Sequence, residues 1–325
     1  MKSKLISLSM VIAIVMTMHA SDYVMLNRLD TASLPVIPIK DYGGDRARSM
    51  LDYDAVWESS DHSAESEMAS IEDVYRVTKR LYRTTHRHYV TFPVAYWSQT
   101  PQGDSLLVSG RVYLPKQRDL NGIIISNHFC TISDEEVPSN MLSLEGVFTM
   151  KGYAVIMPDY VGYGLSSDDR QANLYWHNAV QTSVDMLENM PTLLSYYGYS
   201  YPLDVVVMGY SQGGAVAFGV ARMLEELGGE WTVRMLYIGV DPYNATGTYL
   251  YTAESDTTNT SLAIPLIAIS LSETYDMEFL LEDFFFEPLL SNYPDWIVSA
   301  EGSIEHMNEL QASNLLFMRY VYQEL

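Results

Sequence analysis

The stretch VVVMGYSQGG at residues 205–214 constrains the fold of this chain more than any other part of it. Three consecutive valines favour a strand, and after the turn apolar residues recur at the spacing of a helix. Ser211 stands at the apex of the sharp turn between them, where Gly209 and Gly213 leave room for the backbone. The pattern predicts an exposed nucleophilic serine beside free helix N–H groups, and the N–H of Gln212 suits a developing oxyanion.

The composition excludes several classes of function. The chain has 325 residues, of which 48% are hydrophobic, so it can bury a large core. A formal net charge of −22 argues against nucleic acid and anionic membranes as partners. Cys130 is the single cysteine, and no spacing of Cys and His is typical of a metal site. The sequence therefore predicts no disulfide within the chain, no metal and no cofactor.

The first 20 residues have the pattern of a secretory signal peptide. Lys2 and Lys4 precede an uncharged apolar run at 5–18, and Ala20 is a plausible last residue before cleavage. The apolar run is too short to cross a membrane comfortably. We therefore expect export to the periplasm or the medium, with no stable membrane anchor.

Strands and helices are predicted to alternate along most of the chain. A β-hairpin comes first, and repeated strand–helix units follow it, an order that implies an α/β fold with a mostly parallel sheet flanked by helices. The expected strands are 89–97, 106–114, 122–127, 153–157, 203–208 and 232–240, and the expected helices are 71–85, 144–151 and 174–197. Pro191 is expected to kink or split the last of these helices.

Four segments are expected along the chain. They are a signal peptide at 1–20, a polar leader at 21–70, a core at 71–243 and a helical lid region at 244–325. In the alternative interpretation the last segment is the end of the core.

Three segments carry a resemblance to a known family. They read NHFCTISDEEVPS at 127–139, MPDYVGYGLSSD at 157–168 and GYSQGG at 209–214. In this order they resemble the secreted lipase and esterase branch of the α/β-hydrolases. The resemblance spans roughly residues 85–300 and implies a serine hydrolase that cleaves small-molecule or lipid esters through an acyl-enzyme on Ser211.

The resemblance also implies the surroundings of the serine. A second oxyanion donor is expected from the loop after the third strand, at Phe129 or Cys130. His128, Tyr160 and Tyr210 are candidate substrate-binding residues. Two of them have a plainer interpretation, in which His128 anchors its loop by hydrogen bonds and Tyr160 belongs to an ordinary glycine-rich turn. For His128 we favour the structural role.

Two interpretations compete for the rest of the catalytic triad. In the first, His306 is the base, because no other histidine follows Ser211, and Asp276 is the acid, with Glu273 or Asp241 as alternatives. In the second, which the sequence favours, residues 244–325 are the helical insertion of the family, and the last strands with their acid and base are absent.

These interpretations lead to different functions. The complete triad predicts an exported serine esterase or lipase, and a serine peptidase of the same fold is the alternative enzyme. The incomplete triad predicts a weakly active or non-catalytic scaffold, because loss of the base lowers the rate of a serine hydrolase by several orders of magnitude.

Overall fold

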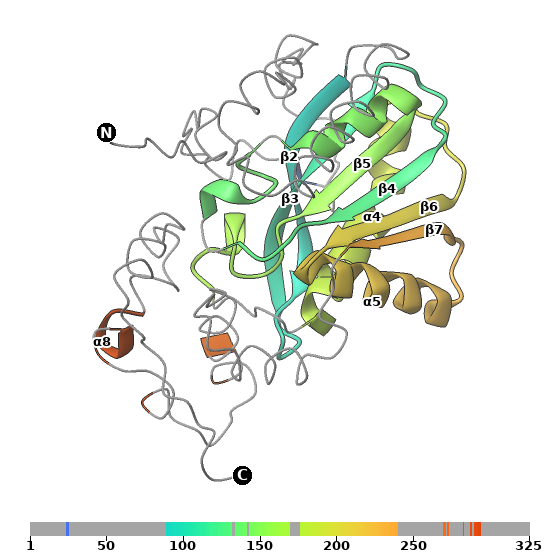
Figure 1. Ribbon diagram of the computed structural model, residues 1–325. Helices are drawn as coiled ribbons and strands as arrows, with labels where there is room; N and C mark the ends of the chain where they lie inside the picture. The colour runs from blue at the N-terminus through green and yellow to red at the C-terminus, as the bar shows by residue number, and fades with distance from the viewer. Residues whose placement is uncertain are drawn as a thin grey trace, which may run out of the picture.

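The computed structural model describes residues 24–25, 89–131, 134–141, 143–169 and 176–239, together with the short pieces 269–270, 272, 282, 287 and 289–293. The elements in chain order are β1 (Val24–Met25), β2 (Tyr89–Gln99), β3 (Ser105–Pro115), β4 (Gly122–Asn127), the 3₁₀ helices η4 (Asp134–Glu136) and η5 (Leu144–Lys151), β5 (Tyr153–Pro158), the 3₁₀ helix η6 (Gly164–Ser166), α4 (Trp176–Tyr196), β6 (Asp204–Tyr210), α5 (Gln212–Leu227), β7 (Thr232–Gly239) and α8 (Leu289–Tyr293) (Figure 1).

One twisted sheet runs through the described part of the chain. Its seven strands lie in the order β1-β2-β3-β5-β4-β6-β7. The pairs β2–β3 and β3–β5 are antiparallel, whereas β5–β4, β4–β6 and β6–β7 are parallel. The predicted hairpin and the mostly parallel sheet are thus confirmed. The strand β4, with three consecutive isoleucines, lies inside the sheet, and all six of its residues are buried, because both faces of a central parallel strand are covered.

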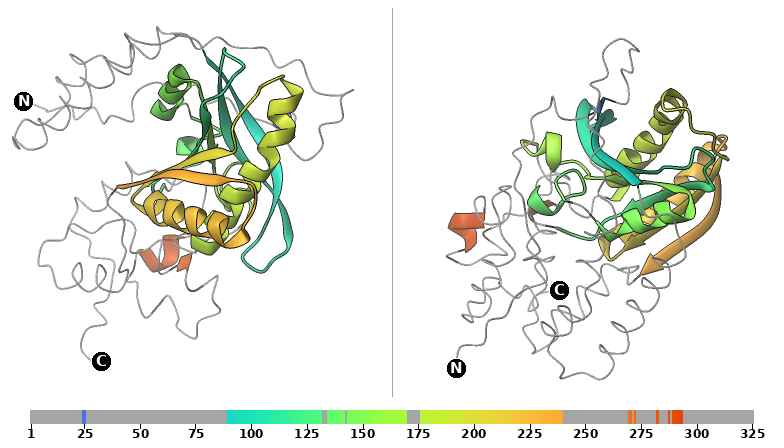
Figure 2. Two further views of the ribbon diagram at one scale, coloured as in Figure 1. Left: turned by 90° about the vertical axis from the view of Figure 1, so that its right-hand side faces the viewer. Right: turned by 90° about the horizontal axis from the view of Figure 1, so that it is seen from above.

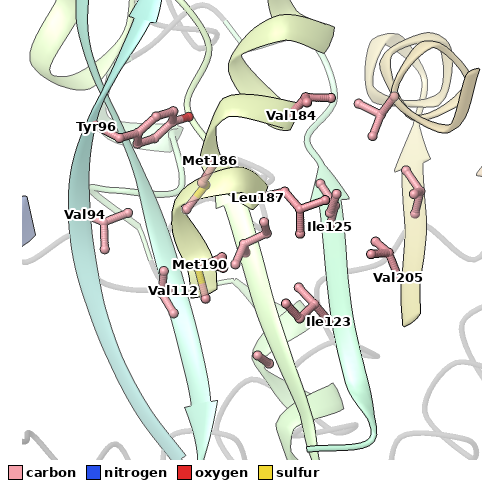
Figure 3. Packing of buried hydrophobic residues seen from close by; sticks show 14 of the residues in the cluster. Val94, Tyr96, Val112, Ile123, Ile125, Val184, Met186, Leu187, Met190 and Val205 are labelled. Atoms are coloured by element: carbon pink, nitrogen blue, oxygen red, sulfur yellow. The ribbon is translucent and has the colours of Figure 1, made fainter. Parts of the chain in front are cut away.

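The two long helices cover one face of the sheet and pack on each other (Figure 2). Leu187 and Met190 of α4 lie against Ile125 of β4 and Val112 of β3 in a cluster whose members are almost fully buried (Figure 3). A smaller cluster on the opposite face joins η5 to the strands through Tyr113, Ile124, Val155 and Met157, with Phe148 packed against it. The core therefore fixes the strand ends that carry the candidate site.

Helix α4 continues through its internal proline. Pro191 lies inside the unbroken helix Trp176–Tyr196, so the expected split does not occur. Burial of Leu193 and Leu194 beyond the proline holds the last turns on the core. The proline nevertheless costs the helix one backbone hydrogen bond.

Substitution of this proline is expected to stabilise the protein. Pro191→Ala restores an N–H donor in the helix interior, so the free energy of unfolding should rise by about 1–3 kcal/mol. Urea denaturation followed by circular dichroism measures the change. Ser195→Ala, on the exposed side of the same helix, serves as the control, and an unfolding midpoint no higher than that of the wild type would contradict the prediction.

The segment predicted as a helix at 144–151 is a 3₁₀ helix in the structure. Gly146 and the β-branched Val147 and Thr149 are weak α-helix formers, which favours the tighter and shorter form. Gly152 ends the segment at φ 79°, a left-handed conformation that favours glycine at the end of a helix.

Other expectations fall outside the described residues. These are the signal peptide, the helix at 71–85, most of the leader and nearly all of the lid region, and the domain boundaries remain predictions. Within the described residues, no helix is both long and apolar enough to span a membrane.

Candidate active site

Three loops meet at one edge of the sheet. The parallel strands β4, β5 and β6 are neighbours, and their carboxyl ends lead directly to His128, Asp159 and Ser211. Because the carboxyl ends of parallel strands lie at the same edge, the topology brings together the three segments that carried the family resemblance. Ligands of open α/β sheets bind at this edge.

The turn that carries Ser211 is strained and closely packed. Ser211 has φ 53° and ψ −123°, a region that residues with side chains rarely occupy. A Cβ on Gly209 would clash with the carbonyl oxygen of Gly213, and a Cβ on Gly213 would clash with that of Asn127. The Ser211 N–H donates to the carbonyl oxygen of Gly239 at 2.9 Å, which ties the turn to the end of β7. Both glycines are therefore required by close backbone approach, as the sequence predicted.

Two segments next to the serine turn carry backbone N–H groups without a partner among the described residues: the start of α5 and the loop after β4. Helix α5 begins at Gln212, so the N–H groups of Gln212 and Gly213 have no partner within the helix. In the loop after β4, no described residue accepts a hydrogen bond from the N–H of Phe129 or Cys130. Free N–H groups beside a nucleophile are the elements of an oxyanion hole.

The loop after β4 is bound to the loop after β5. The Tyr163 hydroxyl donates to the carbonyl oxygen of Thr131, and the Gly164 N–H donates to Asp134 Oδ1 at 2.5 Å. These contacts join residues that lie about 30 positions apart in the chain. The loop after β4 is therefore bound to the glycine-rich turn after β5.

A buried carboxyl group, that of Asp159, lies between the loop after β4 and the loop after β5. Asp159 is fully buried and accepts hydrogen bonds from the Ser109 hydroxyl at 2.6 Å and the Ser139 N–H at 2.8 Å. Burial raises the pKa of Asp159, and the hydrogen bonds from the two serines and the nearby Arg111 charge oppose that rise. The buried guanidinium of Arg111 donates to the carbonyl oxygen of Pro138 at 2.5 Å. This hydrogen bond ties the positive charge of Arg111, on β3, to the segment that follows β4.

The raised pKa of Asp159 predicts a pH dependence of stability. A carboxyl whose pKa is higher in the folded state than its ordinary 3.8 stabilises the fold at low pH, and this contribution is lost as pH rises through the folded-state pKa. Asp159→Asn cannot ionise, so the stability of the wild type relative to this variant should fall as pH rises above the ordinary value. Urea denaturation of both proteins across a series of pH values measures the free energy of unfolding of each. A free energy of the wild type that rises with pH relative to that of the variant would contradict the prediction.

The ring of His128 lies between two carbonyl groups. Its Nδ1 lies 2.7 Å from the carbonyl oxygen of Phe129 and its Nε2 lies 3.1 Å from that of Asp159. The ring stacks on Tyr160 with centroids 4.2 Å apart. Burial lowers the pKa of His128, so the ring is neutral at pH 7. A neutral ring carries one N–H and donates it to one of these two carbonyl oxygens, both of which belong to the loops beside the ring. This is the kind of contact that the loop-anchoring role would require.

The other predicted site residues occupy different positions. Tyr160 is only 3% exposed, whereas Tyr210, just before the serine, is 56% exposed and Phe129 is 52% exposed. Cys130 is partly buried, and burial raises the pKa of its thiol to about 12, which disfavours the nucleophilic thiolate. The exposed apolar surface near Ser211 thus comes from Phe129 and Tyr210.

The candidate acids and base lie outside the described residues. This holds for Asp241, Glu273, Asp276 and His306. Within the described residues, no cluster of three or more His, Cys, Asp or Glu side chains could hold a metal ion.

The sequence did not single out the residues of the buried network. Ser109, Arg111 and Ser139 stand far from the serine in the chain, and Asp159 stood out only as part of a motif. A polar residue in the middle of an otherwise apolar strand, as Arg111 is in β3, is the signal that could have drawn attention to them.

The sequence and the fold were compared with those of known proteins. Residues 108–232 match the model of the dienelactone hydrolase family. A search of curated protein sequences finds no match.

Solved structures share the fold at low sequence identity. A proposed hydrolase from Legionella pneumophila has a TM-score of 0.65 and 21% identity, over 73% of this chain and 65% of that chain. The rice cell wall degrading esterase LipA from Xanthomonas oryzae has a TM-score of 0.62 and 18% identity, over 71% of this chain and 65% of that chain. The match thus covers slightly less than two thirds of the length of these structures.

These likenesses agree with the strand order and with the sharp strand-to-helix turn at Ser211, the elbow of this fold. A hairpin, a parallel sheet with β5 between β3 and β4, and a serine on the turn after β6 are all present. The chain therefore has the α/β-hydrolase fold, and its central part matches the dienelactone hydrolase family.

Proposed function

We propose that this protein is an exported serine hydrolase that cleaves carboxylic esters through an acyl-enzyme on Ser211. The observation that carries the proposal is the strained backbone of Ser211 at φ 53°, held between glycines that tolerate no side chain and next to N–H groups at the start of a helix. Backbone strain of this kind persists where function requires it. The esterase among the similar folds and the matched hydrolase family support the same class of reaction.

The proposed chemistry has two steps. The Ser211 hydroxyl attacks the ester carbonyl carbon while a base takes its proton, and the N–H of Gln212 stabilises the oxyanion. The alcohol then leaves with that proton, and water hydrolyses the acyl-enzyme. His306 is the proposed base and Asp276 the proposed acid, in the chain order that the fold requires.

The substrate is proposed to be a small-molecule or lipid ester. Phe129 and Tyr210 offer exposed apolar surface close to the nucleophile, and the net charge of −22 disfavours anionic partners. Export is proposed from the signal-like residues 1–20.

The proposal is tested with paired substrates. We expect p-nitrophenyl acetate and butyrate to show an initial burst followed by steady turnover, and a dipeptide p-nitroanilide to remain uncleaved. Ser195→Ala, which alters an exposed serine of α4, is the control and should hydrolyse both esters at the rates of the wild type. Cleavage of the amide without the esters would favour the peptidase, and no turnover of either substrate by folded protein would favour the non-catalytic scaffold.

A further inference from the structure

Two exposed aromatic side chains lie near the nucleophile. Tyr210, the residue before Ser211, is 56% exposed, and Phe129, in the loop after β4, is 52% exposed. Large apolar side chains are usually kept from water, so two exposed rings beside a candidate active site indicate a binding surface. Contacts within the protein fix the ring of Tyr210 and the backbone that carries the ring of Phe129.

The ring of Tyr210 lies over the end of β7. Tyr210 is the partner of Gly239 in the register of β6 and β7. A Cβ on Gly239 would meet Cδ2 of the Tyr210 ring at 2.8 Å and Cε2 at 3.5 Å, so one edge of the ring rests on the Gly239 backbone. The carbonyl oxygen of the same glycine accepts the hydrogen bond from the Ser211 N–H at 2.9 Å. Gly239 therefore leaves room for the ring and holds the serine turn beside it.

The backbone of Phe129 is held close to the serine turn. The carbonyl oxygen of the preceding residue, His128, lies against the first turn of α5, where it would meet a Cβ on Gly213 at 2.6 Å. The Tyr160 hydroxyl donates to this same oxygen at 3.3 Å. The carbonyl oxygen of Phe129 itself lies 2.7 Å from Nδ1 of His128. Contacts on both sides of the Phe129 Cα thus set the place from which its exposed ring projects.

The sheet puts these two aromatic residues on opposite sides of the nucleophile. Strand β6, which leads to Ser211, lies between β4 and β7 (Figure 1). Phe129 follows β4, whereas the ring of Tyr210 lies over the end of β7. Neighbouring strands are about 4.8 Å apart, so roughly 10 Å separates the two flanking backbones, with the serine between them. The acyl and alcohol parts of an ester extend in different directions from the carbonyl carbon, and each part can meet one of the two aromatic residues.

We propose that Phe129 and Tyr210 form two aromatic walls that select esters carrying an aromatic ring, one wall for a ring in the acyl part and the other for a ring in the alcohol part. The inference rests on the proposed function and narrows its substrate class. Aromatic rings gain from offset-stacked and edge-to-face contacts with one another, a gain that a saturated ring of similar size lacks. The net charge of −22 disfavours rings with a carboxylate or another anionic group.

The test compares aromatic and saturated rings of similar size. The p-nitrophenyl esters of 3-phenylpropanoate and 3-cyclohexylpropanoate probe the acyl part, and benzyl and cyclohexylmethyl acetate probe the alcohol part. In each pair, saturated carbon separates the ring from the ester group, so the intrinsic reactivities are nearly equal. The saturated ring has the larger apolar surface, so burial alone would favour it. We expect kcat/KM to be at least about threefold higher for the aromatic member of each pair.

Variants that replace one ring by an aliphatic side chain locate this preference. Phe129→Leu should remove the aromatic preference in one pair and Tyr210→Leu should remove it in the other, because leucine keeps apolar surface without a ring. Phe129→Tyr and Tyr210→Phe keep a ring and should keep both preferences. Each preference is a ratio of two substrates measured on one preparation, so it does not depend on how much of a variant is folded.

Tyr196→Leu is the matched control. Tyr196 is 41% exposed and ends α4, which leads to the start of β6 and therefore to the edge of the sheet opposite Ser211. This variant should keep both preferences. A wild-type preference below about threefold in either pair, or one that both the Phe129→Leu and Tyr210→Leu proteins retain, would overturn the proposal and leave Ser211-dependent hydrolysis intact. A wild-type protein without Ser211-dependent turnover of any of the esters would overturn the proposed function and this inference together.

Discussion

Ser211→Gly is expected to abolish ester hydrolysis and to stabilise the fold at the same time. The variant lacks the nucleophile, so kcat should fall by at least about 10⁴-fold. Glycine adopts φ 53° without strain, and relief of that strain should raise the free energy of unfolding by about 1 kcal/mol after the greater flexibility of the unfolded chain is counted. Ester assays and urea denaturation of the same preparation measure both effects.

Ser211→Ala is the matched control for this prediction. Alanine also lacks the hydroxyl but still carries a Cβ, so activity should be lost without the gain in stability. Unchanged hydrolysis in either variant would exclude Ser211 as the nucleophile. Equal stability of the two variants would show that the strain at this position is negligible.

Gly213→Ala is expected to destabilise the fold strongly through a single added methyl group. The new Cβ would meet the carbonyl oxygens of Asn127 and His128, which are backbone atoms at the end of a central strand. Neither can move without disturbing β4 or the loop that follows it, so we expect a loss of about 3 kcal/mol in stability. The kcat of ester hydrolysis should fall as well, because the displaced loop lies against the turn that carries Ser211.

Gly229→Ala is the control for the added methyl group. A Cβ on Gly229, just after α5, would meet no atom within 4 Å, so stability and activity should stay near wild type. Thermal unfolding and ester turnover of the two variants are compared side by side. A Gly213→Ala protein as stable and active as the Gly229→Ala protein would mean that the elbow is not packed as the structure has it.

The parts of the fold that were predictable from sequence are those encoded by short segments. Three valines, a serine between glycines and a helical repeat lie within one stretch of chain, so the elbow at 205–214 follows from local preferences. The apolar run of β4 similarly predicts a strand buried on both faces.

The buried hydrogen bonds around Asp159 and Arg111 could not be predicted in this way. It joins Ser109 to Asp159 and Arg111 to Pro138, residues brought together by strand register. Nothing in the local sequence says that Tyr160 adopts a positive φ, as the nearby Gly162 and Gly164 do. The continuous helix through Pro191 also depends on tertiary burial, which overrides the local cost of the proline.

The candidate acid and base also depend on contacts between residues that are far apart in the sequence. Asp276 and His306 were selected by their order in the chain, and order alone does not place two side chains beside a serine. Activity of His306→Ala and Asp276→Asn variants will decide whether they act together with Ser211.

Reaction with a fluorophosphonate tests the central claim most directly. The probe phosphonylates a serine only when an activated hydroxyl and an oxyanion hole are assembled around it. We predict one phosphonyl group for each folded molecule, located by peptide mass spectrometry on Ser211 and absent from Ser211→Ala. A folded wild-type protein that remains unlabelled, or that is labelled at another residue, would contradict the account.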